Sequence, residues 1–182
     1  MWKIGIIYIY KDAISMDKFR QAEKILSENI YCCIATTSKA GSPWNTPVFY
    51  SYDQKLNLYW ASAIDSMHSQ NLKENPSAFI VIYNSSAAPR TATALYLQGQ
   101  VNTVADHHLD EIVQRHFKRV NEDSLFTGDY YRDSSPERLY QFNTQKAWIL
   151  GKPMNKERHS IDTRKELCIN ELKSLLKKKF LF

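Results

Sequence analysis

Short runs of strand-forming residues, separated by tight turns, constrain the fold of this chain more than any other feature of its sequence. Residues 31–37, 44–52 and 56–61 are rich in β-branched and aromatic side chains. Residues 38–43 and 53–55 separate these runs and have the composition of turns. Connections this short join antiparallel neighbours, because parallel strands need a crossover of a dozen or more residues. We therefore predict an antiparallel meander in this region.

Helical and strand-like segments alternate through the remainder of the chain. The predicted helices cover residues 15–30, 66–75, 106–120 and 161–180. The further predicted strands cover residues 79–83, 93–104 and 139–150. Gly99 interrupts the second of these strands, which predicts a bulge or the close approach of another backbone. Antiparallel strands with helices between them favour a closed or split barrel over an open sandwich.

The organisation of the chain indicates a single domain. Its 182 residues are the common size of one domain, and the sequence contains no internal repeat or obvious linker. We predict a domain over residues 15–182 that ends in an amphipathic helix capped at Asp162 or Thr163. Residues 1–14 form an N-terminal extension, whose apolar start is either an edge strand or poorly ordered. This run is too short to span a bilayer, so we expect no membrane association.

Charge and cysteine content narrow the class of protein. The net charge of +5 is concentrated near the C-terminus, at Lys173 and residues 177–179. Such a cluster either binds nucleic acid or forms a solvated helix face, and we favour the solvated face because no matching basic stripe occurs elsewhere. Three cysteines, with Cys32 and Cys33 adjacent, do not suggest a disulfide framework. A reducing cytoplasm is therefore the expected location.

The sequence contains none of the common catalytic signatures, whether a phosphate-binding Walker loop, a GxGxxG turn, a GxSxG elbow or a CxxC pair. The adjacent His107 and His108 would point about 100° apart on a helix, so we predict no metal site there. His116 lies on the apolar stripe of its helix, which predicts a core position. Catalytic residues therefore stay unassigned.

Two polar segments are candidates for ligand binding. Asn45 and Thr46 lie beside Pro47, which marks a strand edge or bulge because proline cannot donate to a ladder. The second segment, residues 66–71, places five hydrogen-bonding side chains in six positions at a helix start. Helix N-termini with such groups bind phosphate, but an exposed polar helix has the same composition. Both interpretations stay open on these residues alone.

An ordered set of motifs between Ile30 and Val104 resembles the pyridoxamine 5′-phosphate oxidase-like, FMN-binding split-barrel family. The motifs are Ala35-Thr36-Thr37, Gly41-x-Pro43-Trp44-x-Thr46-Pro47-Val48, Leu58-Tyr59-Trp60-x-Ser62, His68-Ser69-x-Asn71, Asn75-Pro76 and Tyr96-Leu97-x-Gly99. A weaker match continues at Lys146-Ala147-Trp148 and Asp162-x-Arg164. The resemblance implies a mainly β fold, a six-stranded antiparallel split β-barrel with flanking helices. It also implies a homodimer that binds FMN at the subunit interface.

The resemblance assigns a role to each residue at the expected flavin site. Residues along the isoalloxazine ring would be Asn45, Thr46, Pro47 and Val48 on one strand and Trp60, Ala61 and Ser62 on the next. Residues at the FMN phosphate would be Ser66, Met67 and His68, with Asn71 close by. Trp148 would come from the partner subunit.

Departures from the family pattern shape the functional hypothesis. True pyridoxamine phosphate oxidases carry Arg at the position of Asn45 and an Arg-Lys pair at Met67-His68. The chain is therefore not expected to be the vitamin B6 enzyme itself. We predict an FMN-dependent oxidoreductase with a small-molecule substrate. The alternative is a non-catalytic, haem-binding or deazaflavin-binding protein of the same fold, with His159 or His107 as the candidate haem ligand.

Overall fold

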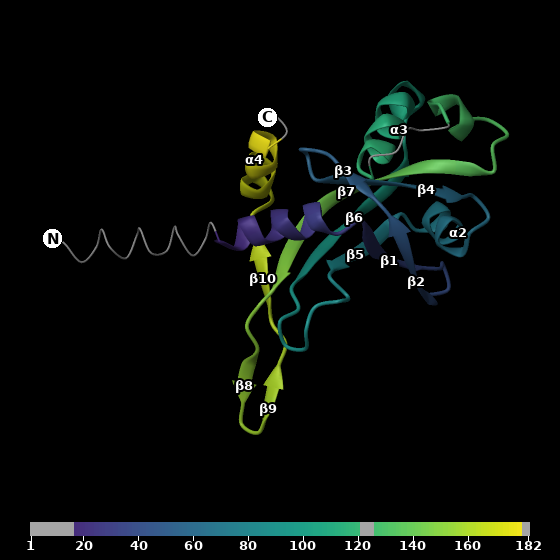
Figure 1. The fold of residues 1–182 in the computed structure, drawn as a ribbon. Helices are drawn as coiled ribbons and strands as arrows, with labels where there is room; N and C mark the ends of the chain where they lie inside the picture. The colour runs from purple at the N-terminus through teal and green to yellow at the C-terminus, as the bar shows by residue number, and fades with distance from the viewer. Residues whose placement is uncertain (1–16, 121–125, 180–182) are drawn as a thin grey trace.

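The computed structural model describes residues 17–120 and 126–179, which form a curled antiparallel sheet flanked by helices (Figure 1). The strands are β1 Tyr31–Thr37, β2 Pro43–Phe49, β3 Ser51–Tyr52, β4 Asn57–Ala63, β5 Ser77–Tyr83, β6 Ala94–Thr103, β7 Glu137–Leu150, β8 Met154–Lys156, β9 His159–Ile161 and β10 Arg164–Leu167. The helices are residues 17–28, α2 Met67–Glu74, α3 Leu109–Lys118 and α4 Ile169–Lys179, with 3-10 turns η1 Asp106–His108 and η2 Gly128–Tyr131. The predicted mainly β fold is confirmed.

One bent run of chain closes the sheet into a barrel. The strand order is β2-β1-β5-β6-β7-β4-β3, so β2 and β3 lie at its two ends. In the chain these two strands are consecutive, and only Tyr50 separates them. The run 43–52 therefore pairs with β1 through its first part and with β4 through its second. Counting β2 and β3 as one strand, the order contains the six strands of the predicted split barrel, with β10 added outside on β7.

The core lies inside this barrel and under two helices that cover one end. Trp60, Tyr50 and Phe142 are the largest fully buried side chains. The helix of residues 17–28 adds Phe19, Ala22, Ile25 and Leu26 to the same cluster, and α4 adds Leu172 and Leu176. A second, smaller cluster lies beneath α3 and includes Tyr59, Leu109, Ile112, Val113 and Leu139. Burial of these apolar faces is the main stabilising contribution to the fold.

Arg119 ties the first helix to the bend at Tyr50. Its Nη2 donates to the carbonyl oxygens of Leu26 and Asn29, each at 2.6 Å. The guanidinium lies over the rings of Tyr50 at 4.6 Å and Tyr52 at 4.8 Å. The Tyr50 hydroxyl also donates to Leu26 O, at 2.9 Å. A cation suits the free carbonyls of a helix C-terminus, so this contact holds the helix against the barrel.

Gly99 lies where β6 meets β7 at closest approach. The β6–β7 register shifts between Gln98 and Gly99, which confirms the predicted irregularity. A Cβ at this position would lie 2.2 Å from the carbonyl oxygen of Asn143 and 2.8 Å from the ring of Phe142. Only glycine fits, because the first of these atoms belongs to the backbone.

The C-terminal region differs from its prediction. The helix expected over residues 161–180 begins only at Ile169, so neither Asp162 nor Thr163 caps it. Residues 159–161 instead form β9, and Arg164–Leu167 forms β10 against β7. Pairing with β7 outweighs the local helical preference of the charged residues in this stretch. The first helix runs over residues 17–28 where 15–30 was predicted, and the expected extension of residues 1–14 lies outside the described residues.

Within the described part of the chain, no helix is long and apolar enough to cross a membrane.

We predict that Gly99→Ala destabilises the protein strongly. The added methyl group would force the β6–β7 ladder apart, at a cost of about 3 kcal/mol in the free energy of unfolding. Gly41→Ala is a matched control, because Gly41 has a φ of 86° but open space around its Cβ position. The left-handed strain alone should cost about 1 kcal/mol there. Urea denaturation measures both values, and equal costs would contradict the close approach.

We also predict that His116 makes the free energy of unfolding fall as the pH is lowered. Its side chain is buried, with the ring 4.3 Å edge-on from that of Phe49, as the core prediction required. Burial lowers the pKa of His116 from 6.5 to about 4, and the positive charge of Arg119 adds to the effect. The imidazole takes up a proton more readily in the unfolded chain than in the folded protein. The contribution of neutral His116 to the free energy of unfolding is therefore complete above pH 6.5. It is lost as the pH falls toward 4.

The measurement compares the free energy of unfolding of the wild type and His116→Gln between pH 7 and pH 4. The advantage of the wild type should shrink with falling pH by up to about 3 kcal/mol. A difference that stays constant with pH would contradict a buried, neutral His116.

Candidate functional site

A cluster of hydroxyl groups and one imidazole surrounds the N-terminus of α2. His68 Nε2 lies 2.8 Å from Ser62 Oγ at the end of β4 and 3.3 Å from Ser66 Oγ. The hydroxyl oxygens of Ser66 and Ser69 are 2.8 Å apart. Ser66 has an extended backbone, and the helix starts at the next residue. We call Ser62, Ser66, His68 and Ser69 the α2 cluster.

The α2 cluster lies next to β1 and β2 because α2 packs on both strands. The buried Asn71 donates from Nδ2 to Thr36 Oγ1 of β1, at 3.1 Å. Thr36 in turn pairs with Trp44 of β2. Three predicted phosphate-end residues thus lie at or within α2, beside the predicted ring-binding strand: Ser66 precedes the helix, and His68 and Asn71 belong to it. Met67 points outward, with 47% of its surface exposed.

The four residues of the α2 cluster are polar and carry no permanent positive charge, while the nearest cations along the ladder and the helix are Arg138, which pairs with Ser62, and Lys73. Residues 61–71 include no lysine or arginine. His68 is 5% exposed, and burial lowers its pKa below 6.5, so its imidazole is neutral at pH 7. The cluster therefore offers hydroxyl groups, a neutral imidazole and the backbone N–H groups of a helix start. Such groups bind an oxyanion through hydrogen bonds without ion pairs.

The predicted residues of β2 and β4 divide between two faces of the barrel wall. Asn45 and Pro47 are exposed on the outer face, while Val48 is buried. Thr46 is half-buried and accepts a hydrogen bond from Trp44 Nε1 at 2.8 Å. On β4, Ala61 and Ser62 are half-buried, and Ser62 belongs to the α2 cluster.

Trp60 lies inside the barrel. Its side chain is fully buried in the core, and the ring stacks on that of Tyr140 with centroids 5.7 Å apart. The indole N–H has no hydrogen-bond partner among the described residues. A ligand on the outer wall would meet only the backbone of Trp60.

Trp148 lies far from the α2 cluster within one chain. It belongs to an outward-facing aromatic platform in which its ring stacks on Phe79 at 6.1 Å. Arg164 lies over Tyr96 at 4.2 Å and over Phe79 at 5.7 Å. Ser62 pairs with Arg138 at the other end of β7, ten residues before Trp148. The platform instead adjoins the predicted ring-binding strand, because Phe79 pairs with Ala35 of β1 and Ala35 pairs with Asn45 of β2.

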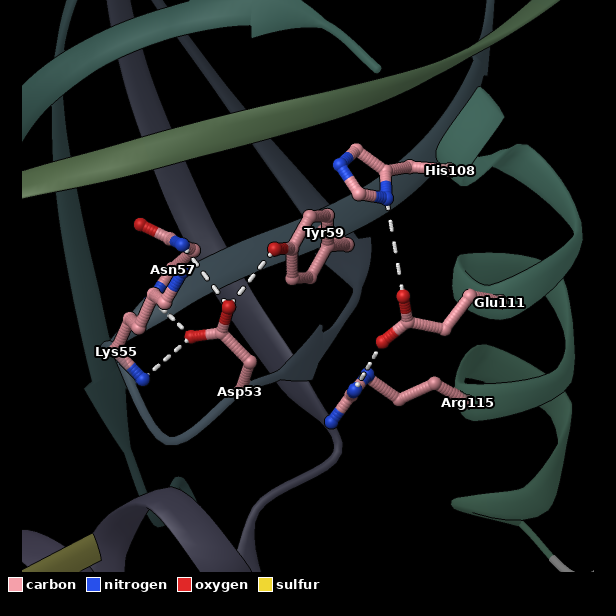
Figure 2. Close-up of polar contacts among 7 residues, drawn as sticks. All are labelled: Asp53, Lys55, Asn57, Tyr59, His108, Glu111 and Arg115. Carbon is pink, nitrogen blue, oxygen red and sulfur yellow. Dashed lines mark hydrogen bonds and ion pairs between the residues drawn. The ribbon is translucent and has the colours of Figure 1, made fainter. Parts of the chain in front are cut away.

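A second polar pocket of about 390 Å³ lies between α3 and the β3–β4 turn (Figure 2). Asp53 accepts four hydrogen bonds there. The donors are the N–H groups of Lys55 and Asn57, the Asn57 side chain and the Tyr59 hydroxyl, at 2.8–2.9 Å. These bonds hold the turn in which Leu56 adopts a φ of 60°. The sequence predicts only a turn at Asp53, and its hydrogen bonds stabilise that turn.

Glu111 forms the opposite wall of this pocket. Its carboxylate lies 2.8 Å from Arg115 Nη2 and 3.8 Å from His108 Nδ1 (Figure 2). Burial, and then the negative charge of Asp53, raise the pKa of Tyr59, so its hydroxyl stays protonated. Because both carboxylates already accept hydrogen bonds or ion pairs, the pocket offers no obvious general base.

Whether the chain can bind a metal ion or a haem depends on where the described side chains lie. Among the described residues, no group of three or more His, Cys, Asp or Glu side chains is placed to hold a metal ion. The two candidate haem ligands lie far apart in sequence, His107 in η1 and His159 in β9, and both are exposed. Ser69 belongs to the predicted polar segment and to the motif of the resemblance, but it was given no role at the site. Its position three residues after Ser66 indicated their contact.

The comparisons with known proteins agree with this architecture. No curated protein is significantly similar to the chain in sequence. Among solved structures, a haem-binding protein from Mycobacterium smegmatis superimposes with a TM-score of 0.62 at 18% identity, over 84% of this chain and 60% of that one. The chain therefore spans less than two thirds of that protein's length. At these identities the likeness concerns the fold alone.

Two further structures extend the comparison. A pyridoxamine 5′-phosphate oxidase homologue from Listeria innocua gives a TM-score of 0.55 at 16% identity, over 72% of this chain and 96% of that one. An F420 reductase gives 0.53 at 14% identity, over 69% and 94%. The family model described as pyridoxamine 5′-phosphate oxidase matches residues 19–151, which is well over half of the chain. The chain belongs to the pyridoxamine 5′-phosphate oxidase-like split-barrel family.

Proposed function

We propose that the protein binds FMN and acts as a flavin-dependent oxidoreductase on a small molecule. The observation that carries this proposal is the α2 cluster, which collects three hydroxyl groups and a neutral imidazole at a helix N-terminus. These donors fit a phosphate group. Ser62, Ser66, His68 and Ser69 would hold the phosphate, and Asn45, Thr46, Pro47 and Ala61 would lie along the ring.

When bound, FMN supplies the capacity to accept and release a hydride or single electrons. The chain's own residues bind and orient it. His68 is a positioning residue, because its buried neutral ring is held by Ser62 at 2.8 Å. The outer wall of the barrel would shield one side of the ring from water, and backbone groups of β2 in contact with the ring would tune its electronics.

A homodimer completes this site. Phe79 of the platform of Phe79, Tyr96 and Trp148 pairs with Ala35, which pairs with Asn45, so the platform and the predicted ring-binding strand share one outer wall that a second copy would cover. The outer face of the barrel also exposes Tyr31 at 59% and Tyr83 at 45%. No described helix packs extensively on β5 or β6. An apolar face of this kind suits an isologous partner.

A different planar cofactor is the second candidate. The α2 cluster lacks the cations that Arg or Lys would provide at Asn45, Met67 and His68, and this favours a ligand bound without ion pairs to a phosphate. Solved structures of similar fold include a haem-binding protein and an F420 reductase. A haem-binding protein, a deazaflavin-binding protein or a non-catalytic protein is thus the alternative.

We further propose a cytoplasmic location, because all three cysteines are free. We expect neither nucleic acid nor a membrane as a partner.

The first test is the visible absorption spectrum of the purified protein, repeated after incubation with FMN and desalting. We predict flavin bands that survive desalting, and no Soret band. Ser66→Ala and His68→Leu should each weaken FMN binding about tenfold, the effect of losing one hydrogen bond to an anion. Ser174→Ala, at an exposed position on α4, is the control and should bind as the wild type does. A Soret band would favour the haem alternative, and loss of all colour would reject the flavin proposal.

The second test is the mass in solution. Sedimentation velocity should show a dimer of the 21.2 kDa chain. Tyr31→Glu places a charge on the outer face and should shift the protein toward monomer by a hundredfold or more in Kd, because a buried unpaired charge is costly. Gln114→Glu, on the exposed side of α3, should leave the mass unchanged. A wild-type monomer would contradict the dimeric site.

A further inference from the structure

A two-stranded hairpin projects from the barrel beyond β7 and β10 (Figure 1). We call residues 152–162 the arm, which contains β8 and β9. Every residue of the arm is exposed. β8 and β9 pair only with each other among the described strands. A two-stranded hairpin contributes little stability by itself, so packing on a further surface would stabilise the arm.

The base of the arm holds it in one direction. The Gly151 N–H donates to Thr163 O at 2.8 Å, and Thr163 Oγ1 donates to Lys152 O at 2.7 Å. These bonds continue the β7–β10 ladder, whose last pair is Leu150 and Arg164. A Cβ at Gly151 would lie 2.4 Å from Thr163 Oγ1, so a larger residue would displace the hydroxyl group that bonds to Lys152 O. The arm is therefore an ordered extension of the barrel wall.

The two faces of the arm differ. Met154 pairs with Ile161, and Lys156 pairs with His159, so these four side chains share one face. Met154 is 55% exposed and Ile161 is 36% exposed. The opposite face carries the pair Asn155 and Ser160, which are small and polar. An arm with one apolar and basic face suits docking on a surface through that face.

We propose that the arm of each subunit packs, through Met154 and Ile161, on a second copy of this chain. This inference rests on the proposed dimer and extends its interface. The arm is continuous with β7 and β10, which carry Trp148 and Arg164 of the aromatic platform on the outer face. In a two-fold interface through that face, every contact occurs twice. The arm of each subunit would then pack on the other subunit.

The dimensions agree with a second copy as the occupant. Five residues of extended chain, 152–156, reach roughly 17 Å, which is about the length of a barrel strand. A standard interface uses about 20–30 residues a side. The exposed and half-buried residues of β1, β2, β5, β6, β7 and β10 number about 30, so this face is large enough for a second copy and the arm would extend it.

The test measures the monomer–dimer Kd of full-length protein by sedimentation velocity. Met154→Ser combined with Ile161→Ser should weaken dimerisation at least tenfold, and replacing residues 153–162 with Asn-Gly should weaken it a hundredfold or more. Asn155→Ser with Ser160→Ala, on the polar face, is the matched control and should dimerise as the wild type does. Circular dichroism establishes that each variant is folded.

A photo-crosslinking residue at position 154 gives a second readout, and it should yield covalent dimers at low protein concentration. A wild-type dimer that is unaffected by all arm variants and forms no crosslink would overturn the arm proposal alone. A monomeric wild type would overturn the arm proposal together with the proposed dimer. FMN binding is measured for the same arm variants. A variant that still binds FMN shows that the arm result does not bear on the proposed cofactor. Crosslinks only to nucleic acid from a defined oligonucleotide mixture would also reject a second copy as the occupant.

Discussion

The bend at Tyr50 is the constraint on which the rest of the structure depends. Because the run 43–52 pairs with β1 before the bend and with β4 after it, both edges of the sheet belong to the same stretch of chain. Closing a sheet removes exposed edges that would otherwise pair with other chains. The buried Tyr50 side chain fills the barrel, and its hydroxyl and the stacked guanidinium of Arg119 both reach Leu26 O.

Closure also assembles the candidate cofactor site. β4 ends beside the strands that begin the meander, and the short connection after Ala63 places α2 against β1 and β2. Ser62 on β4 and His68 on α2 meet as a consequence. The α2 cluster itself offers hydrogen-bonding groups more than charge, because burial lowers the pKa of His68 and no lysine or arginine occurs between residues 61 and 71.

Local sequence signals predicted the parts of the fold that depend on neighbouring residues. The turns at 38–43 and 53–55 predicted the meander, Gly99 predicted the irregular β6–β7 register, and the apolar stripe predicted a buried His116. The strands after residue 150 were missed, because β10 exists only through its pairing with β7. Charged residues such as Arg164 and Glu166 give no strand signal of their own.

The candidate site was predictable to a similar extent. Its polar residues on α2 follow from composition, and the resemblance placed them at a phosphate. Which face each residue of β4 occupies depends on barrel closure, so the burial of Trp60 was not foreseen. The aromatic platform around Trp148 likewise forms only when β5, β6 and β7 pair, so local sequence could not predict it.

The central claim is that the α2 cluster is the phosphate end of a flavin site, and NMR tests it most directly. FMN added to ¹⁵N-labelled protein should shift the backbone amide signals of Ser66, Met67 and Ser69 and the imidazole signals of His68. Shifts confined to Tyr59, Glu111 and Arg115 would place the ligand in the pocket under α3 and contradict the account. An unchanged spectrum at saturating FMN would contradict flavin binding altogether.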